Sequence, residues 1–248
     1  MFAAHGVVPG AAVRGRTTSV RRAARWIAVA LLVGAAGTAV AQCTMPLPGE
    51  GTAQDPYEID GPVAFVSMTD EFAELTQYDS YDACWSASFE LTNDVDLSGV
   101  NEAGIDVVPI GRAVPGDSFA GEDTFSGTFD GGNHAIYDFR AETDPAARDP
   151  SGLALFAQVR DAVVRDVTFV NPVVSSTSYE VAVVAGAAHD ATIHDVTISG
   201  ADVRGGSVVG GVAGRVTGGT WTNVTVRATS VSVVDTDKTN RTWRGGGL

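Results

Sequence analysis

The stretch IHDVTI at residues 193–198 recurs along the chain at a fixed spacing. Equivalent stretches are IYDFRA from Ile136, VRDVTF from Val164 and WTNVTV from Trp221. Their polar anchors are 28, 29 and 28 residues apart, at Asp138, Asp166, Asp195 and Asn223. Fixed spacing of this kind is typical of a solenoid, in which a repeat buries its apolar face only when a neighbour stacks on it.

Two further sets of apolar residues keep the same spacing. They are Leu155–Phe156, Val184–Ala185 and Val212–Ala213, and then Val174, Val203 and Val231. Within one repeat, Val196 and Ile198 alternate with Thr197, which is the periodicity of a strand with one buried face. The chain must bend at His194–Asp195, because Ile193 is apolar but lies three residues before Val196.

About 28 residues at ~3.3 Å each make one coil of about three short strands. The sequence therefore predicts an all-β fold, a right-handed parallel β-helix with equivalent residues stacked ~4.8 Å apart. The expected inner columns are Ile136/Val164/Ile193/Trp221 and Phe139/Val167/Val196/Val224, and the expected outer column is Thr168/Thr197/Thr225.

Several motifs also resemble one bacterial repeat family. FSGTFDGGNHAI at 125–136, GLALF at 152–156 and VGGVAG at 209–214 resemble GLUG-type β-helix repeats, which read F-x-G-x-F-D-G-x-G-H-x-I, G-L-F-G and V-G-G-L-V-G. The segments GTAQDPYEI at 51–59 and LTNDVDLSG at 91–99 are similar to those that open such domains. The resemblance covers residues 51–248, with alanines replacing some turn glycines. It implies a secreted or surface-exposed bacterial protein, often adhesin-like and sometimes a non-catalytic part of a cell-surface peptidase.

Residues 1–41 have the pattern of a secretory signal peptide. They contain five arginines and no acidic residue, then an apolar run from Trp26 that ends in Ala39-Val40-Ala41. The run is shorter than the ~20 residues that span a bilayer, so we expect export and cleavage before Gln42 without a transmembrane segment.

The mature chain is strongly acidic. Without the five arginines of residues 1–41, 11 basic residues remain against 30 acidic ones, a net charge of −19. Such a surface repels nucleic acid and anionic membranes, and it favours solubility and divalent cations. Adaptation to a salty environment explains the same composition.

Residues 42–100 are expected to form an N-terminal cap with the first strands. Cys43 and Cys84 lie outside the regular repeats, and in an exported protein such a pair predicts a disulfide. The segment 63–78 has helical spacing, with Val63, Val66, Phe72 and Leu75 expected on one face and Thr69–Asp70 expected to cap the start of its second half. We expect this short helix to cover the end of the β-helix.

Residues 101–248 are expected to hold the GLUG-like repeats. Loop excursions are predicted at 103–122 and 144–151. The chain ends in Gly-Gly-Gly-Leu248, which is how a further repeat would begin, so we expect a C-terminal truncation. The last coil would then lie open, and an open coil favours self-association.

The candidate metal residues are Asp138, Asp166 and Asp195. If they share one corner of successive coils, they lie ~4.8 Å apart and need turn amides or a cation to offset their repulsion. A calcium ladder and a glycosidase-like acid pair are two possible roles. A structural Asx corner is the favoured alternative, because Asn223 takes the fourth position.

Other polar residues point weakly to chemistry. Asp94 and Asp96 share a strand face, as carboxylates do in some β-helix hydrolases and lyases. His189, Asp190, His194 and Asp195 are close enough in sequence to bind a metal, although no known ligand motif accompanies them. His134 follows a predicted turn and is expected to bond locally. No catalytic nucleophile motif and no phosphate-binding or dinucleotide-binding glycine loop occurs in the sequence.

Three functions follow from these features. The first is an exported, non-catalytic β-solenoid that acts as a stalk or adhesion surface, with a glycan or a cell-surface protein as partner. The second is a polysaccharide-active enzyme or carbohydrate-binding module, which would need exposed aromatic rings in a row. Trp221 is expected to face inward, which leaves Trp85 and Trp243 in the mature chain. The third is an accessory repeat region of a larger cell-surface protein, such as a peptidase.

Overall fold

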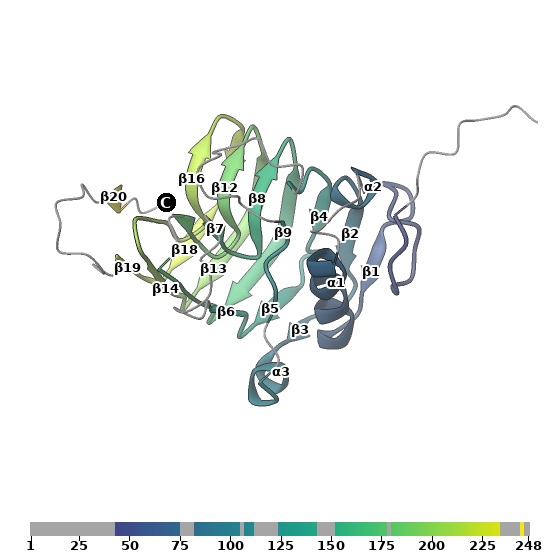
Figure 1. Ribbon diagram of the computed structural model, residues 1–248, viewed down its shortest axis with the longest axis horizontal. Coiled ribbons are helices and arrows are strands. Elements are labelled where there is room, and N and C mark those ends of the chain that lie inside the picture. The colour runs from purple at the N-terminus through teal and green to yellow at the C-terminus, as the bar shows by residue number, and fades with distance from the viewer. Residues whose placement is uncertain are drawn as a thin grey trace, which may run out of the picture. The chain divides into compact units, whose positions relative to one another are not determined.

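Figure 1 shows the computed structural model, in which parallel β-strands predominate and helices are few. The structure describes residues 43–74, 82–104, 107–111, 124–142, 152–177, 180–233 and 244–245. These residues belong to one compact unit, Ala39–Leu248. The predicted signal peptide, Leu75 of the predicted helix, Trp243 and most residues of the two predicted loop excursions lie outside the described residues.

The described strands form four sheets. Sheet 1 contains β1 (Tyr57–Ile59), β2 (Ser88–Leu91), β3 (Val95–Asp96), β4 (Thr128–Asp130), β5 (Ala135–Tyr137), β9 (Val163–Val170), β13 (Thr192–Ser199), β17 (Thr220–Thr222) and β18 (Thr225–Arg227). Sheet 2 contains β6 (Arg140–Glu142), β10 (Val173–Ser175), β14 (Asp202–Gly205) and β19 (Ser230–Val233). Sheet 3 contains β7 (Gly152–Leu153), β11 (Glu180–Val181), β15 (Val208–Val209) and β20 (Arg244–Gly245). Sheet 4 contains β8 (Phe156–Arg160), β12 (Ala185–His189) and β16 (Ala213–Thr217).

From β8 onward the chain visits sheets 4, 1, 2 and 3 in turn and then begins again at β12. Each strand pairs in parallel with its equivalent in the next repeat, so the predicted spacing sets the register. The predicted columns that pair as expected are Val164–Ile193–Trp221, Val174–Val203–Val231, Thr168–Thr197–Thr225 and Phe156–Ala185–Ala213. The parallel, mainly β character of the fold is therefore confirmed.

The core lies between the sheets and is lined by β-branched and aromatic residues. In β13, Ile193, Val196 and Ile198 are fully buried, and Thr197 between the last two is half-buried on the other face. Burying one such apolar side chain contributes about 1.5–3 kcal/mol relative to leaving it exposed. Near β4 and β8 the core is mainly aromatic, and the Phe125 and Phe156 rings stack with centroids 4.6 Å apart.

In each repeat the chain bends at three positions that are five residues apart. One bend precedes the strand of sheet 1, one lies in its middle and one follows it. Each bend contains a residue with positive φ, and small polar residues and glycine tolerate that conformation best. The first bend has Asp161, Asp190 and Gly218, the second has Asp166, Asp195 and Asn223, and the third has Asn171, Gly200 and Ala228. The aspartates of the repeat are therefore explained first by backbone geometry.

The predicted alignment of Ile136 with Val164 is wrong. Strand β5 pairs with the second half of β9, so Ile136 lies opposite Phe169, while Phe129 of β4 lies opposite Val164. The short strands β4 and β5 together match the length of β9, and the turn at 131–134 joins them. Both residues of the predicted pair are nevertheless fully buried.

The same shift moves the residues that follow Ile136. Asp138 falls at the third bend, next to Asn171 in the neighbouring repeat, rather than at the second bend. Phe139, which was predicted to stack on Val167, instead packs edge-on against the ring of Phe169, with centroids 6.2 Å apart. The predicted column of three aspartates at one corner is therefore absent from this fold.

Helix α1 spans Pro62–Glu74 and presents a different face from the predicted one. The exposed fraction of Val63 is 79%, whereas Phe65, Met68 and Phe72 are fully buried. Thr69, which was predicted to cap the second half of the segment, is buried within one continuous helix, and its hydroxyl donates to the Val66 carbonyl at 2.9 Å. The buried positions keep helical spacing, so the helix was correctly predicted but its phase was not. Two shorter helices, α2 (Asp82–Trp85) and α3 (Ser98–Glu102), follow.

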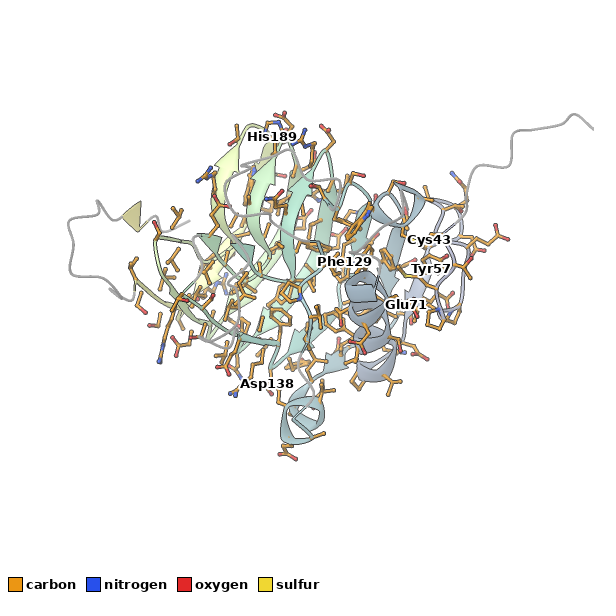
Figure 2. The ribbon with its side chains drawn as sticks, in the orientation of Figure 1. Cys43, Tyr57, Glu71, Phe129, Asp138 and His189 are labelled. Atoms are coloured by element: carbon orange, nitrogen blue, oxygen red, sulfur yellow. A yellow bond between two sulfur atoms is a disulfide. The ribbon has the colours of Figure 1, made fainter. Side chains whose placement is uncertain are left out.

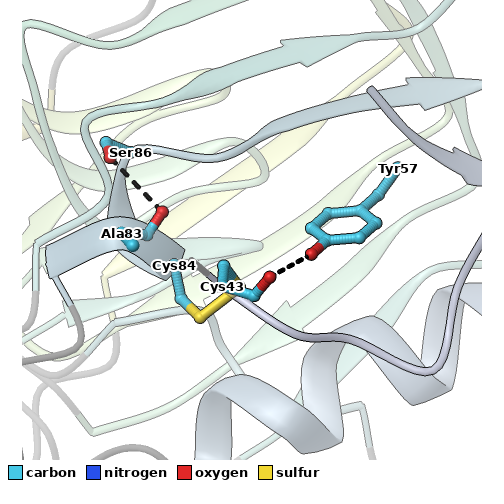
Figure 3. The surroundings of a disulfide bond; sticks show 5 residues. All are labelled: Cys43, Tyr57, Ala83, Cys84 and Ser86. Carbon is cyan, nitrogen blue, oxygen red and sulfur yellow. Dashed lines mark hydrogen bonds between the residues drawn. A yellow bond between two sulfur atoms is a disulfide. The ribbon is translucent and has the colours of Figure 1, made fainter. Parts of the chain in front are cut away.

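The predicted disulfide between Cys43 and Cys84 is confirmed, with Cα atoms 4.7 Å apart (Figure 3). Both cysteines are buried, and the Tyr57 hydroxyl donates to the Cys43 carbonyl at 2.6 Å. Burial raises the pKa of the Tyr57 hydroxyl, so the group stays a donor at neutral pH. A closure of this loop length is typically worth about 2–4 kcal/mol. It ties the first described residues to α2.

Candidate functional site

The strongest cluster of polar side chains lies at the second bend of sheet 1. Asp166, Asp195 and Asn223 occupy this bend in successive repeats with φ of 53°, 56° and 52°. Strands β9, β13, β17 and β18 hold them in register, and the outward residues beside them are Arg165, His194 and Thr222. We refer to these six residues as the Asx corner.

Asp195 is the most fully bonded carboxylate of the Asx corner. Its Oδ2 lies 2.7 Å from Nδ1 of His194, and its Oδ1 accepts a hydrogen bond from Nδ2 of Asn223 at 2.9 Å. The hydrogen bond from His194, followed by that from Asn223, lowers the pKa of Asp195 below its usual value. A lowered pKa in the folded state means that Asp195 stabilises the fold at neutral pH, and this contribution is lost as the pH falls through that pKa.

Arg165 provides the positive charge beside Asp166. Its guanidinium lies 2.6 Å from Asp130 on the preceding strand and 3.9 Å from Asp166. Along the Asx corner, each aspartate thus has an arginine, a histidine or an amide within reach. The repulsion predicted for stacked carboxylates is offset by these side chains, which favours the structural role of the corner.

The geometry brings part of the predicted metal set together. Among the described residues, Asp166, His194 and Asp195 can each place a ligand atom within 4.8 Å of the others. Asp138 lies at another bend and does not join them. Calcium prefers six to eight oxygen ligands, and a set of two carboxylates and one imidazole fits that preference poorly. Calcium binding stays a prediction.

The other predicted polar sites are separate from the Asx corner. His189 pairs in register with Thr217 at the end of sheet 4, and its Nε2 lies 3.2 Å from Asp190. The four residues predicted as a metal set thus divide between two bends, because His189 and Asp190 belong to the first and His194 and Asp195 to the second. Figure 2 shows His189 at the upper edge of the view and Asp138 near the lower edge, with Phe129 between them.

Asp94 and Asp96 both bond to nearby backbone. Asp94 accepts a hydrogen bond from the Ala135 amide at 2.9 Å and lies 3.3 Å from Nδ1 of His134. Asp96 accepts from the Ser98 amide at 2.9 Å, and bonding to Ser98 lowers the pKa of Asp96. Each carboxylate therefore holds a turn or a strand end, and the two do not converge on one shared point.

The sequence did not reveal the ion pair between the buried Glu180 and the half-buried Arg215. Glu180 is 6% exposed, and its Oε1 lies 2.7 Å from Nε of Arg215 on a strand of the next repeat. Burial raises the pKa of Glu180, while Arg215 opposes that rise. In the sequence, Glu180 is recognisable only as an acidic residue before an apolar run. Its partner Arg215 cannot be identified there, because it lies 35 residues further along the chain.

Aromatic side chains do not form an exposed row in the described part of the chain. Trp85 and Tyr57 are buried, and Trp221 and Tyr137 are half-buried. Trp221 faces the core, as predicted. A sugar-binding groove needs exposed rings, so these four side chains do not provide one.

Substitutions of Asp195 distinguish a metal site from a structural corner. We expect Asp195→Asn to leave the urea midpoint of unfolding close to that of the wild type, because asparagine tolerates positive φ and Asn223 already fills the equivalent position. Asp195→Val should lower the urea midpoint clearly more than Asp195→Asn, because a β-branched residue is strained at the positive φ of this position.

The measurement is urea unfolding of both variants, with and without calcium. A calcium-dependent stabilisation that Asp195→Asn abolishes would contradict the structural interpretation and support a metal site.

Comparisons with known proteins give little further information. The sequence matches no protein-family model and no curated protein. Among solved structures, the fold is similar to that of a "putative immunoglobulin A1 protease" from Bacteroides ovatus. The TM-score is 0.44 at 16% identity, over 79% of this chain and 69% of that one. Similarity at this level supports no conclusion about fold or activity.

Within the described residues, none of the helices is both long enough and apolar enough to cross a bilayer.

Proposed function

We propose that this chain is an exported right-handed parallel β-helix, related to the GLUG-type bacterial repeats, that acts as a non-catalytic stalk or adhesion module at the cell surface. The observation that carries the proposal is the order of the strands. From β8 to β19 the chain visits sheets 4, 1, 2 and 3 repeatedly, and equivalent strands pair in parallel. A solenoid explains that order directly, because each repeat contacts mainly its neighbours.

The cap proposed for one end of the β-helix is helix α1. Its buried face contains Phe65, Met68 and Phe72. The ring of Phe72 lies 4.9 Å from that of Trp85 and 5.8 Å from that of Phe89 on β2. A helix that buries aromatic side chains next to the first strands shields the core there, which is what an exposed solenoid end requires.

A non-catalytic role is supported by the bonding of the polar side chains. Asp94, Asp96 and Asp195 each bond to a turn amide, a histidine or an asparagine that fixes the local backbone. A catalytic site needs a nucleophile or an acid–base pair that converges on one point. Asp166, His194 and Asp195 share the second bend, where Arg165 and Asn223 bond to the two carboxylates, and the other candidate residues lie elsewhere.

Export is supported by residues 1–41 and by the disulfide. The amino-terminal sequence has the basic, apolar and small-residue parts of a signal peptide. The disulfide between Cys43 and Cys84 fits an oxidising compartment.

We further propose that the outward face of the repeats binds a glycan or a protein on another cell.

Export is tested by expressing the full chain in a bacterium and sequencing the exported protein. We expect a mature amino terminus at Gln42 and no free thiol, because oxidation in the periplasm would follow cleavage. The matched variant is Ala41→Arg, which should block cleavage by replacing the small residue at that site. A full-length chain that stays in the cytoplasm with two free thiols would contradict export.

The stalk or adhesion role is tested with the same exported protein, in binding assays on glycan arrays and on cells, together with polysaccharide hydrolysis assays. Binding without turnover is expected, and turnover of any polysaccharide would overturn the non-catalytic role.

A further inference from the structure

Two Asp-Gly pairs occur in the sequence, at residues 60–61 and 130–131. An aspartate before a glycine can undergo an intramolecular reaction, in which the glycine amide nitrogen attacks the aspartate side-chain carboxyl group. Glycine favours this attack because it has no Cβ to hinder the approach and its backbone is conformationally free. Such a reaction is fast only where the reacting atoms can reach the right geometry. The fold places the two pairs in opposite environments.

The pair Asp130–Gly131 is held at both of its reacting groups. Oδ2 of Asp130 lies 2.6 Å from the guanidinium of Arg165, and its Oδ1 accepts a hydrogen bond from the Gly132 amide at 2.9 Å. The Gly131 amide, which would be the nucleophile, donates to the Arg165 carbonyl at 2.8 Å. Gly131 is also buried, so the attack requires the turn to leave β9 and to break these bonds.

The pair Asp60–Gly61 lacks restraints of this kind. Asp60 is exposed between β1 and α1, and within the described part of the chain no hydrogen bond or ion pair holds its carboxylate. The Gly61 amide donates to no backbone carbonyl among the described residues. A Cβ on Gly61 would meet no other atom within 4 Å, so the space around the nucleophile is open. Both reacting groups can therefore approach each other without local unfolding.

The same pair joins an anchored strand to an anchored helix. Ile59 ends β1, which pairs with β2, and its carbonyl accepts from the Thr92 amide at 3.0 Å. On the other side, the fully buried Phe65 of α1 donates its amide to the Gly61 carbonyl at 3.0 Å. A change in the length of this joint therefore acts directly on the first turn of α1.

We propose that Asp60 is a site of spontaneous isoaspartate formation in the folded protein, whereas its contacts protect Asp130. The Gly61 nitrogen forms a bond to Cγ of Asp60, and one oxygen of the protonated carboxyl group leaves as water with the carboxyl proton and the amide proton. The product is a succinimide ring, which then adds one water. Opening at the side-chain carbonyl restores aspartate. Opening at the main-chain carbonyl gives isoaspartate, whose backbone is longer by a methylene group directly before α1.

The test is incubation of the purified, exported full chain at neutral pH for several weeks. Isoaspartate is quantified by enzymatic methylation of its α-carboxyl group, and fragmentation mass spectrometry assigns it to a residue, because the two isomers have the same mass but give different backbone fragments. We expect isoaspartate to accumulate at Asp60 at least about tenfold faster than at Asp130, because only the first pair can reach the geometry of attack. In guanidinium chloride, which removes the contacts of Asp130, the two residues should react at similar rates.

The matched variant is Gly61→Ala, which adds a methyl group in open space and hinders the attack. It should lower the rate at Asp60 by roughly tenfold and leave the rate at Asp130 unchanged, and circular dichroism should show an unchanged fold. Three results would each overturn the proposal. They are an intact Asp60 in the folded protein under conditions in which the unfolded chain reacts, a rate at Asp130 equal to that at Asp60 in the folded protein, and an undiminished rate in folded Gly61→Ala.

Discussion

Replacing Phe156 by alanine should lower the free energy of unfolding by about 3–5 kcal/mol, the typical range for a buried phenylalanine. The side chain is fully buried at the junction of sheet 4 with the aromatic core. Its ring stacks on Phe125 with centroids 4.6 Å apart and meets Phe129 edge-on at 5.7 Å. Alanine removes both ring contacts and leaves a cavity, and the pairing of Phe156 with Ala185 of β12 and its bridge to Ile110 limit how far the backbone can move to close it. Urea unfolding followed by circular dichroism measures the loss.

Two variants serve as controls for the loss at Phe156. Val63→Ala removes apolar atoms from a side chain that is 79% exposed, so it should change stability by less than about 0.5 kcal/mol. Phe156→Leu keeps most of the buried volume and should cost clearly less than alanine. A loss at Phe156→Ala no larger than that at Val63→Ala would show that the aromatic core is not packed as described.

The later repeats could be predicted from the sequence because their spacing is regular. Val164, Ile193 and Trp221 are 29 and 28 residues apart and pair as expected. In a parallel sheet a slip of one residue would move buried side chains to the outer face, so the apolar pattern allows one register. The same argument holds for Val174 and Val203.

The earlier repeat could not be aligned because two registers satisfy the same pattern. The bends recur every five residues, and each has an apolar residue close before it and after it. The segment Ile136–Asp138 can therefore be aligned with residues 169–171 at the third bend as well as with residues 164–166 at the second bend. The turn at 131–134 selects the third bend, since it splits the strand that β9 forms as one piece. As a result, the sequence alignment places Asp138 with Asp166 and Asp195, whereas the structure places it at the third bend.

Contacts between side chains of different sheets could not be predicted from the sequence, for a separate reason. Repeat spacing relates equivalent positions in neighbouring repeats, but it does not relate one sheet to the next around the repeat. Glu180 and Arg215 come from sheets 3 and 4, so their contact depends on the turn that joins β11 to β12. Gly186 lies just after that turn, and a Cβ there would come within 2.6 Å of the Ala157 carbonyl oxygen. The missing side chain at Gly186 allows this close approach, which the sequence shows only as a glycine.

Replacing Arg215 by methionine should lower the free energy of unfolding by about 2 kcal/mol at neutral pH, because it leaves the buried Glu180 carboxylate without its partner, while the exposure of Arg215 to solvent keeps the loss below that of a fully buried pair. Methionine keeps much of the stem of the arginine side chain, so the loss reports the charge rather than the packing. Glu180→Gln should cost less, because a neutral amide needs no counter-charge and its oxygen still accepts from Arg215.

The dependence on pH separates this electrostatic effect from a packing defect. Burial raises the pKa of Glu180 above its value in the unfolded chain, and Arg215 opposes the rise. A raised pKa of an acid in the folded state gives stability that is present below the unfolded pKa and lost as the pH increases through the folded pKa. Without Arg215 the pKa of Glu180 should rise further, so the deficit of Arg215→Met should be small near pH 4 and grow towards about pH 7. In the double variant with Glu180→Gln that growth should disappear, whereas a deficit equal at both pH values would assign the loss to packing alone.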